Sequence, residues 1–354
     1  MLALMRELTE AVGLPGYEAE IRSLMARYLS GLAEIEYDNL GSLIAHRVGD
    51  ASGPRIMLAA HMDEIGFMVK SITDEGFLRF QTLGGWWEHV MLAQRVTVRT
   101  SKGDLTGVIG STPPHVLKAD ERKKVLDKDN MFIDIGVESK DEAIAKGVRP
   151  GDPVIPICPF TPMANDRYLL AKAWDNRFGC LVLIEVMRAL QEQSHPNTLY
   201  VAATVQEEVG LRGAATSANA INPDVSFALD VCIAGDTPGM QPQQVTAKMG
   251  KGPVIMLYDA SMVPHTGLRD FVMDSAAAEG IDVQFDAMAG GGTDAGRIHI
   301  SGRGVPSLVI SVPTRYIHSH ASIVHRDDVE NVVKLMLAVI KRLDKAALAS
   351  IRGW

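Results

Sequence analysis

The sequence predicts an α/β protein in which a small all-β segment interrupts one α/β domain. Apolar runs of strand length alternate with amphipathic helical segments in the first and last parts of the chain, as in a layered α/β fold. Between them, in residues 69–164, short alternating segments are separated by Gly, Asp and Pro, which indicates β-structure. A length of 354 residues also exceeds what one hydrophobic core usually serves.

The first part of the chain predicts two helices, a hairpin and a buried strand. Apolar positions recur at helical spacing in residues 2–12 and 18–30, on either side of a break that contains Gly and Pro. Residues 38–41 carry the turn residues of a hairpin. Residues 55–60 form a largely apolar run, as in a strand that is buried on both faces, and they lead directly into His61.

The central segment, residues 69–164, predicts a small all-β module rather than further α/β layers. The α/β domain would then comprise residues 1–68 and 165–354. Within the module, residues 118–130 are densely charged. We interpret them as a solvated loop, with a specific contact in an assembly as the alternative.

The α/β pattern returns after residue 165. Strands are predicted at residues 198–205, 225–231, 253–258 and 305–312. Helices are predicted at residues 177–192, 210–220 and 267–280. A last helix begins at Asp327, where Glu330 three residues later forms a capping pair.

Composition and charge narrow the classes of function. The net charge of −8 argues against a nucleic-acid-binding protein, which needs a basic face for phosphates. Charged residues near the N-terminus and the lack of a run of about 20 apolar residues predict a soluble, cytoplasmic protein. The three cysteines are far apart in apolar runs, which predicts buried, reduced thiols.

Side chains that can bind metal gather where the predicted strands end. Ligands of open α/β sheets bind beyond the carboxyl ends of the strands. Two imidazoles and five carboxylates occupy such positions or the start of a helix: His61, Asp63, Asp175, Glu207, Glu208, Asp230 and His318. One of them alone would more often be a cap or a turn former. So many together predict a metal site.

Five of these side chains suffice for two divalent metal ions. One bridging carboxylate, with one imidazole and one acid for each ion, accounts for His61, Asp175, Glu208, Asp230 and His318. Imidazole and carboxylate suit zinc, cobalt or manganese, and the set offers no thiolate. Paired metals about 3.5–4 Å apart are a recurrent means of generating a hydroxide and holding a substrate oxygen.

The adjacent acids Glu207 and Glu208 indicate a division of roles. One acid can bind metal while its neighbour stays free as a general base, which passes a proton from water to the leaving amine. The spacing leaves open which acid does which, and two surface acids at a helix start are the alternative. Asp63 lies on the same strand face as His61 and could hold the second ring nitrogen of that histidine.

Six short motifs follow one another along nearly the whole chain. They are Ala60-His61-Met62-Asp63-Glu64-Ile65-Gly66, Ala173-Trp174-Asp175-Asn176-Arg177, Gln206-Glu207-Glu208-Val209-Gly210, Leu229-Asp230-Val231, Gly290-Gly291-Gly292-Thr293-Asp294-Ala295-Gly296 and Pro313-Thr314-Arg315-Tyr316-Ile317-His318-Ser319. As a set they resemble the M42 metallopeptidases, the glutamyl and deblocking aminopeptidases. The long interval between His61 and Asp175 has room for an inserted domain, whereas relatives of the M20 type insert theirs after the glutamate pair.

The resemblance implies a role for each of these side chains. Asp175 would bridge two divalent ions, with zinc or cobalt expected first and manganese as another option. The other ligands would be divided between the ions as His61 with Asp230 and Glu208 with His318. Glu207 would be the general base, and Asp63 would orient His61.

The same resemblance implies a phosphorylase/hydrolase-like α/β/α sandwich with an inserted β-barrel, residues 69–164, that serves oligomerisation. Family members commonly form dimers that assemble into hollow tetrahedral dodecamers. The implied activity is that of a dinuclear aminopeptidase, which removes the N-terminal residue of short peptides with a metal-bound hydroxide.

Other functions stay open on the sequence alone. A deacylase, a carboxypeptidase or a glycosidase with two carboxylates could use the same site. A carboxypeptidase needs Arg or Lys for the terminal carboxylate of its substrate, and a glycosidase would not need His61 or His318. An inactive, cage-forming scaffold is the non-enzymatic alternative, but all five metal ligands and Glu207 are present.

Three further features carry weaker predictions. The glycine-rich residues 290–296 lack the ending of a phosphate-binding loop and are expected to form a tight turn near the substrate. His265 and Arg269 are expected to line the substrate pocket. His320, two residues after His318, is expected to face solvent rather than to bind metal.

Overall fold

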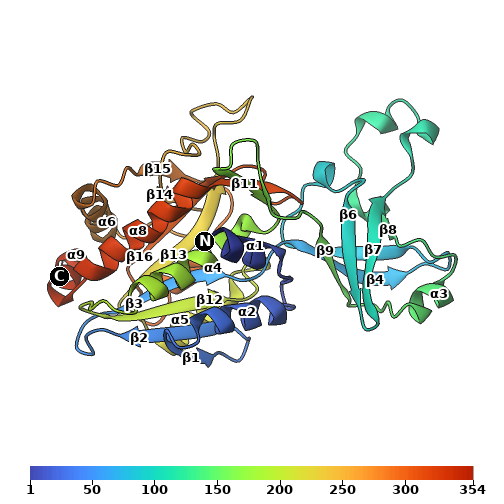
Figure 1. Cartoon of the computed structure of the whole chain (residues 1–354). Coiled ribbons are helices and arrows are strands. Elements are labelled where there is room, and N and C mark those ends of the chain that lie inside the picture. Colours follow the sequence, from blue (N-terminus) through green and yellow to red (C-terminus); the bar gives the residue numbers. More distant parts are fainter. Residues whose placement is uncertain (354) are drawn as a thin grey trace.

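An eight-stranded mixed sheet forms the centre of the larger part of the molecule in the computed structural model, which describes residues 1–353 (Figure 1). In spatial order its strands are β1 (Glu34–Tyr37), β2 (Leu43–Val48), β12 (Thr198–Thr204), β3 (Arg55–His61), β13 (Val225–Ile233), β16 (Ser307–Thr314), β14 (Val254–Tyr258) and β15 (Gln284–Ala287). The four central strands, β12, β3, β13 and β16, are parallel and almost entirely buried. Their carboxyl ends therefore meet at one edge of the sheet.

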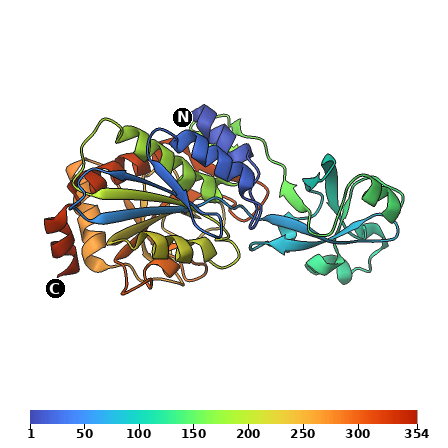
Figure 2. The same cartoon turned by 90° about the horizontal axis from the view of Figure 1, so that it is seen from below.

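Helices cover both faces of this sheet (Figures 1 and 2). One face packs against α1 (Leu2–Glu10), α2 (Ala19–Leu29), α4 (Trp174–Ala189), α6 (Thr266–Ala278), α8 (Arg326–Arg342) and α9 (Lys345–Arg352). The other face packs against α5 (Arg212–Ile221) and α7 (Ala295–Ile298). The predicted α/β/α sandwich is confirmed, because each sheet face buries its apolar side chains under helices.

A closed barrel stands to one side of the sandwich (Figures 1 and 2). Its strands, in spatial order, are β4 (Gly66–Ile72), β5 (Leu78–Leu83), β8 (Phe132–Asp134), β7 (Gly103–Gly110), β6 (Arg95–Thr100) and β9 (Pro153–Pro156). The barrel has its own apolar core and carries α3 (Lys140–Ala145). The predicted β-barrel insert is confirmed. Its first strand begins ahead of residue 69, and the division of the chain into domains stays a prediction.

Three short strands that the sequence did not predict lie beside the sandwich. They are β10 (Thr161–Pro162), β11 (Tyr168–Ala171) and β17 (Ser322–His325), which form a small antiparallel sheet. β17 follows the segment that contains His318, and β11 precedes the segment that contains Asp175. The small sheet therefore holds two parts of the predicted site next to each other.

A buried arginine ties the start of α4 to the N-terminal part of the chain. The guanidinium of Arg177 donates hydrogen bonds to the backbone oxygens of Leu8, at 2.5 Å, Ala11, at 2.9 Å, and Met62, at 2.9 Å. Because Met62 stands between His61 and Asp63, these contacts fix the backbone of the first motif. A planar, permanently charged donor group suits several carbonyls at once.

The three cysteines are free thiols, of which Cys180 and Cys232 are buried and Cys158 is partly exposed. Within residues 1–353, no helix combines the length and the apolar character that crossing a membrane requires.

Candidate metal centre

Strand and helix ends bring six of the seven predicted side chains to one cavity of about 370 Å³. They come from the end of β3, the carboxyl-terminal half of β13, the start of α4, the β12–α5 loop and the β16–β17 loop: His61, Asp230, Asp175, Glu207, Glu208 and His318. Asp63 lies buried just behind them. Residues 290–293 of the glycine-rich segment line the same cavity, and their place beside a substrate stays a prediction.

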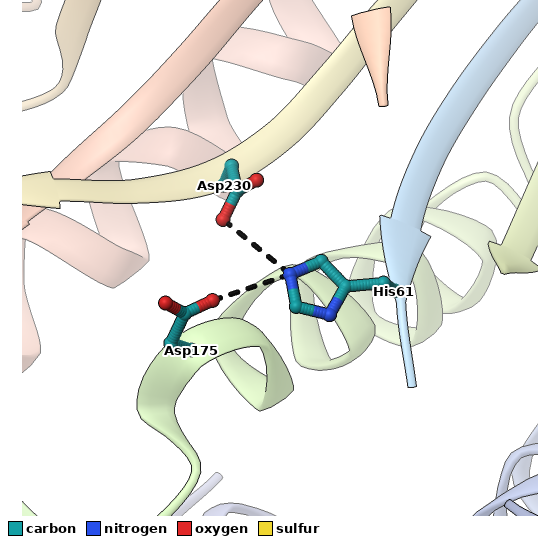
Figure 3. Close-up of side chains that lie close together, drawn as sticks. All are labelled: His61, Asp175 and Asp230. Carbon is teal, nitrogen blue, oxygen red and sulfur yellow. Dashed lines mark ion pairs between the residues drawn. The ribbon is translucent and has the colours of Figure 1, made fainter. Parts of the chain in front are cut away.

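Asp175 stands between the two histidines. Its Oδ1 lies 3.2 Å from Nε2 of His61, and its Oδ2 lies 3.4 Å from Nε2 of His318. Figure 3 shows the carboxylates of Asp175 and Asp230 pointing at the same ring nitrogen of His61. A carboxylate that directs one oxygen to each of two imidazoles has the arrangement of a bridging ligand.

The potential metal-binding atoms form two groups that share Asp175. His61, Asp175 and Asp230 make one group, and Asp175, Glu208 and His318 make the other, with all ligand atoms of a group within 4.8 Å of one another. The structure thus brings together the five predicted metal ligands. Glu207 is in neither group, although its Oε2 lies 3.8 Å from Nε2 of His61.

Backbone carbonyls orient both histidines. Nδ1 of His61 donates to the backbone oxygen of Asp63 at 2.9 Å, and Nδ1 of His318 donates to that of Gly85 at 2.8 Å. A carbonyl can only accept, so Nδ1 of each ring carries a proton, and Nε2 is the nitrogen that would bind a metal.

The sequence predicted that the carboxylate of Asp63 contacts the ring of His61, but its principal contacts are with the backbone. It accepts hydrogen bonds from the backbone N–H groups of Glu207, at 3.0 Å, and Glu208, at 3.1 Å. Its Oδ1 lies 3.7 Å from Nδ1 of His61, which is farther than the backbone oxygen of the same residue. Asp63 therefore positions the glutamate pair directly, and its proposed effect on His61 passes through its backbone.

Burial, neighbouring acids and the two histidines shift the pKa values of the acids in the cluster. Burial, reinforced by the charge of Asp175, raises the pKa of Glu208 to about 8. Burial also raises the pKa of Glu207 well above its ordinary range and, less strongly, that of Asp230. Burial would raise the pKa of Asp175 as well, but hydrogen bonds from His318 and His61 lower it well below its usual range.

The histidines respond in the opposite sense to burial. Burial lowers the pKa of a histidine, yet the hydrogen bond to Asp175 and the charge of Glu208 raise that of His318 to about 10. The charge of Glu207 and the hydrogen bonds to Asp175 and Asp230 likewise raise the pKa of His61 well above its ordinary value. Both histidines therefore keep their positive charge in this cavity to a higher pH than an ordinary histidine does.

The residues present fit divalent metal ions. Imidazole nitrogens and carboxylate oxygens are ligands that zinc, cobalt and manganese accept. Oε1 of Glu208 is buried and has no hydrogen-bond partner among residues 1–353, a cost of about 1–3 kcal/mol that a cation would remove.

The metal-free protein is expected to lose stability as the pH rises. The folded chain holds protons more tightly than the unfolded chain on Glu208, between its ordinary pKa of 4.5 and about 8, and on His318, between 6.5 and about 10. Raising the pH through these windows removes that stabilisation. Asp175 acts with the opposite sign, but only below its ordinary pKa of 3.8.

Thermal unfolding of chelator-treated protein measures this effect. We expect Tm to fall by about 5 °C or more between about pH 6 and about pH 9. Added metal takes the place of the protons, so the slope should flatten. A Tm of the metal-free protein that rises over this range would contradict the expectation.

Left-handed backbone conformations occur beside several site residues. Ala173, Gln206 and His318 have φ angles of 58°, 57° and 56°. Such conformations cost a residue with a Cβ about 1–3 kcal/mol and persist only where the surrounding structure enforces them. Here they precede Asp175 and Glu207 and include His318 itself.

Sequence analysis missed the contribution of the barrel to this site. The Gly84-Gly85 pair follows β5, and a Cβ on Gly85 would lie 3.1 Å from Nδ1 of His318. A Cβ on Gly84, whose φ is +82°, would lie 3.0 Å from Oε2 of Glu208. The barrel loop therefore approaches the cavity closely only because both residues are glycine. The glycine pair at the end of a short strand was the available signal.

Asp294 is a second residue that sequence analysis did not single out. It is buried, accepts a hydrogen bond from Oγ1 of Thr204 at 2.5 Å, and burial raises its pKa to about 7. It adds another acid to the electrostatic environment of His61 and Glu207.

The weaker predictions for His265, Arg269 and His320 were wrong. His265 lines a different cavity, together with His299 and Arg303, and Arg269 pairs with Asp270 at the surface. His320 does not face solvent, since it is only 4% exposed. The ring of Trp86 from the barrel covers it at a centroid distance of 5.1 Å.

The α/β/α sandwich, the inserted barrel and the paired imidazole–carboxylate cluster have the arrangement expected of a metal-dependent hydrolase. Residues 41–335 match the sequence profile of the M42 glutamyl aminopeptidases. The chain belongs to the M42 peptidase family and is a hydrolase of the aminopeptidase class.

Individual relatives support this assignment over the full length. The glutamyl aminopeptidase of Lactococcus lactis subsp. cremoris is 37% identical over 353 residues, covering 99% of this chain and 98% of the relative. The crystal structure of a TET aminopeptidase from a marine-sediment Thaumarchaeota archaeon is similar with a TM-score of 0.97 and 48% identity, covering 99% and 98% of the two chains. The TET1 peptidase of Pyrococcus horikoshii, which can assemble into a tetrahedron or a large octahedral shell, has a TM-score of 0.86 and 37% identity, covering 97% and 99%.

Proposed function

We propose that this chain is a dinuclear metal-dependent aminopeptidase that removes the N-terminal residue of short peptides. The observation that carries the proposal is the position of Asp175, with one carboxylate oxygen directed to His61 and the other to His318. Asp230 is the second acid on the side of His61, and Glu208 is the second acid on the side of His318. When bound, two divalent ions, zinc or cobalt first and manganese as another option, would polarise the scissile carbonyl and acidify the attacking water.

The general base in this proposal is Glu207. It lies in the cavity without belonging to either group of potential ligands, and its carboxylate is largely buried. It takes a proton from the attacking water and returns it to the nitrogen of the leaving amine. A pKa raised by burial and by neighbouring acids suits a group that must hold a proton between these two steps.

We further propose that the chain forms homo-oligomers, with dimers assembling into a tetrahedral dodecamer through contacts of the barrel, residues 69–164. The assembly of the Pyrococcus horikoshii TET1 peptidase supports this, because that chain is similar to this one over nearly its whole length. The charged barrel residues 118–130 are mostly exposed and available for such contacts. A cytoplasmic location stays a prediction from the sequence.

A panel of free and N-acetylated peptides tests the activity. Chelator-stripped protein is assayed alone and after addition of zinc, cobalt or manganese. Cleavage that needs metal and a free amine would support the aminopeptidase. Equal or better cleavage of acetylated peptides would indicate another amidohydrolase, such as a deacylase. No hydrolysis with any metal would favour the inactive scaffold, and the panel would also name the preferred N-terminal residue.

A further inference from the structure

A second cavity, of about 660 Å³, lies next to the metal cavity. We call it the barrel groove, because residues 87–94 of the barrel form one side of it. The end of β13 and residues 314–321 of the β16–β17 region form the other side. Ile233, Ile317 and His318 line both cavities. The barrel groove therefore begins at the metal centre and continues away from it.

The side chains of the barrel groove are mainly apolar and aromatic. Trp87 and Tyr316 line it and are 61% and 58% exposed, so both rings are accessible to a bound ligand. Among the lining residues that the structure describes, Arg315 has the only fixed charge. Asp236 neutralises it with two hydrogen bonds, of 3.0 and 2.8 Å. The groove thus suits an uncharged, large side chain.

One polar side chain of the barrel groove lacks a partner within the described chain. His320 is only 4% exposed, and neither of its ring nitrogens has a hydrogen-bond partner in residues 1–353. Burying unpaired polar atoms costs about 1–3 kcal/mol for each group. A backbone amide of a bound peptide could pair with this ring, whereas an apolar wall alone would need no histidine there.

The two cavities differ in which end of a peptide they can hold. The metal cavity is the smaller one and is lined by Glu207, Glu208 and residues 290–293. An aminopeptidase substrate has only one residue before the scissile bond, but the chain continues on the other side of that bond. The smaller cavity suits the single N-terminal residue, and the larger barrel groove suits the continuing chain.

We propose that the barrel groove binds the peptide residue that follows the scissile bond and favours a large apolar or aromatic side chain there. The inference rests on the proposed aminopeptidase function and adds a preference on the leaving-group side. Trp87 and Tyr316 contact that side chain, and His320 hydrogen-bonds to the peptide backbone next to it.

The test compares substrates that share their N-terminal residue, Xaa, chosen as the best one in the peptide panel. Xaa-Phe fills the barrel groove, whereas the simple amide Xaa-NH2 does not reach it. We expect kcat/KM of the wild-type protein to be at least about tenfold higher for Xaa-Phe than for Xaa-NH2. Trp87→Ala should reduce this ratio about tenfold.

Tyr37→Ala is the matched control, because Tyr37 is a 55% exposed aromatic residue on β1 and lines neither cavity. It should leave the ratio as in the wild type. His320→Phe keeps a ring against Trp86 but removes the nitrogens, and His320→Gln keeps polar atoms. The Xaa-Phe preference should survive better in His320→Gln, with bound metal measured in both variants to confirm that His318 is undisturbed.

The outcomes separate this inference from the proposed function. A wild-type protein that cleaves both substrates equally well, or a Trp87→Ala variant with an unchanged ratio, would overturn the role of the barrel groove and leave the aminopeptidase intact. A metal-loaded protein that cleaves neither substrate would overturn the aminopeptidase itself.

Discussion

Glu207→Gln is expected to lower kcat about 10²–10⁴-fold while leaving metal binding in place. Gln has the size of Glu and keeps one oxygen at the same position, but it does not accept a proton from water at neutral pH. Because Glu207 lies outside both ligand groups, its substitution removes no predicted metal ligand. Steady-state kinetics on the best substrate of the peptide panel measures the loss, and elemental analysis measures the bound metal.

Two other glutamates provide the comparison for this variant. Glu208→Gln should lose metal as well as activity, because Glu208 belongs to the group with Asp175 and His318. Glu185→Gln changes a glutamate of α4 that pairs with Arg188 outside both cavities, and it should change neither property. If Glu207→Gln loses metal and Glu208→Gln retains it, the two acids have exchanged roles. Full activity of Glu207→Gln would exclude it as the base.

The positions of the candidate ligands could be predicted because they follow buried strands. The run at residues 55–60 is apolar enough to mark β3 from the sequence alone, so His61 necessarily stands at its carboxyl end. The same holds for Glu207 and Glu208 after β12. Since β12, β3 and β13 are parallel neighbours, residues at their ends converge without any further information.

Contacts between the two parts of the molecule could not be predicted in this way. The hydrogen bond between His318 and Gly85 joins residues that are 233 positions apart, in the β16–β17 loop and in the barrel. The same loop region explains the error for His320, which Trp86 covers and Phe67 approaches. Local patterns report on one strand or helix, whereas burial of a loop residue depends on which distant segment packs over it.

The role of Asp63 shows a related limit. The sequence placed its side chain near His61, although β3 ends at His61 and Asp63 lies just beyond the strand. It did not predict the competing donors that approach from the β12–α5 loop. The backbone N–H groups of Glu207 and Glu208 point at the carboxylate and bind it more closely than the imidazole does. Every residue except proline has the same backbone N–H donor, so no sequence pattern predicts which of these groups will bind a carboxylate.

Asp175→Asn is expected to weaken the binding of both metal ions to the chain. The substituted amide is neutral and has only one oxygen, so it cannot present an anionic oxygen to both His61 and His318 as the carboxylate does. Loss of this shared ligand should weaken metal binding at least about 100-fold. Losses of up to about 100-fold already follow when a residue that only supports a metal ligand is replaced, and Asp175 is proposed as a ligand itself. Activity should fall below detection at metal concentrations that saturate the wild type.

Single-site variants make this prediction specific to a shared ligand. Asp230→Asn and Glu208→Gln each remove an acid from one group only, so each should weaken one of two binding events in a metal titration. Asp175→Asn should weaken both. Asp270→Asn, which changes an exposed carboxylate paired with Arg269, is the control and should titrate like the wild type. If Asp175→Asn loses only one binding event, the carboxylate serves a single ion, and the paired geometry at His61 and His318 has another cause.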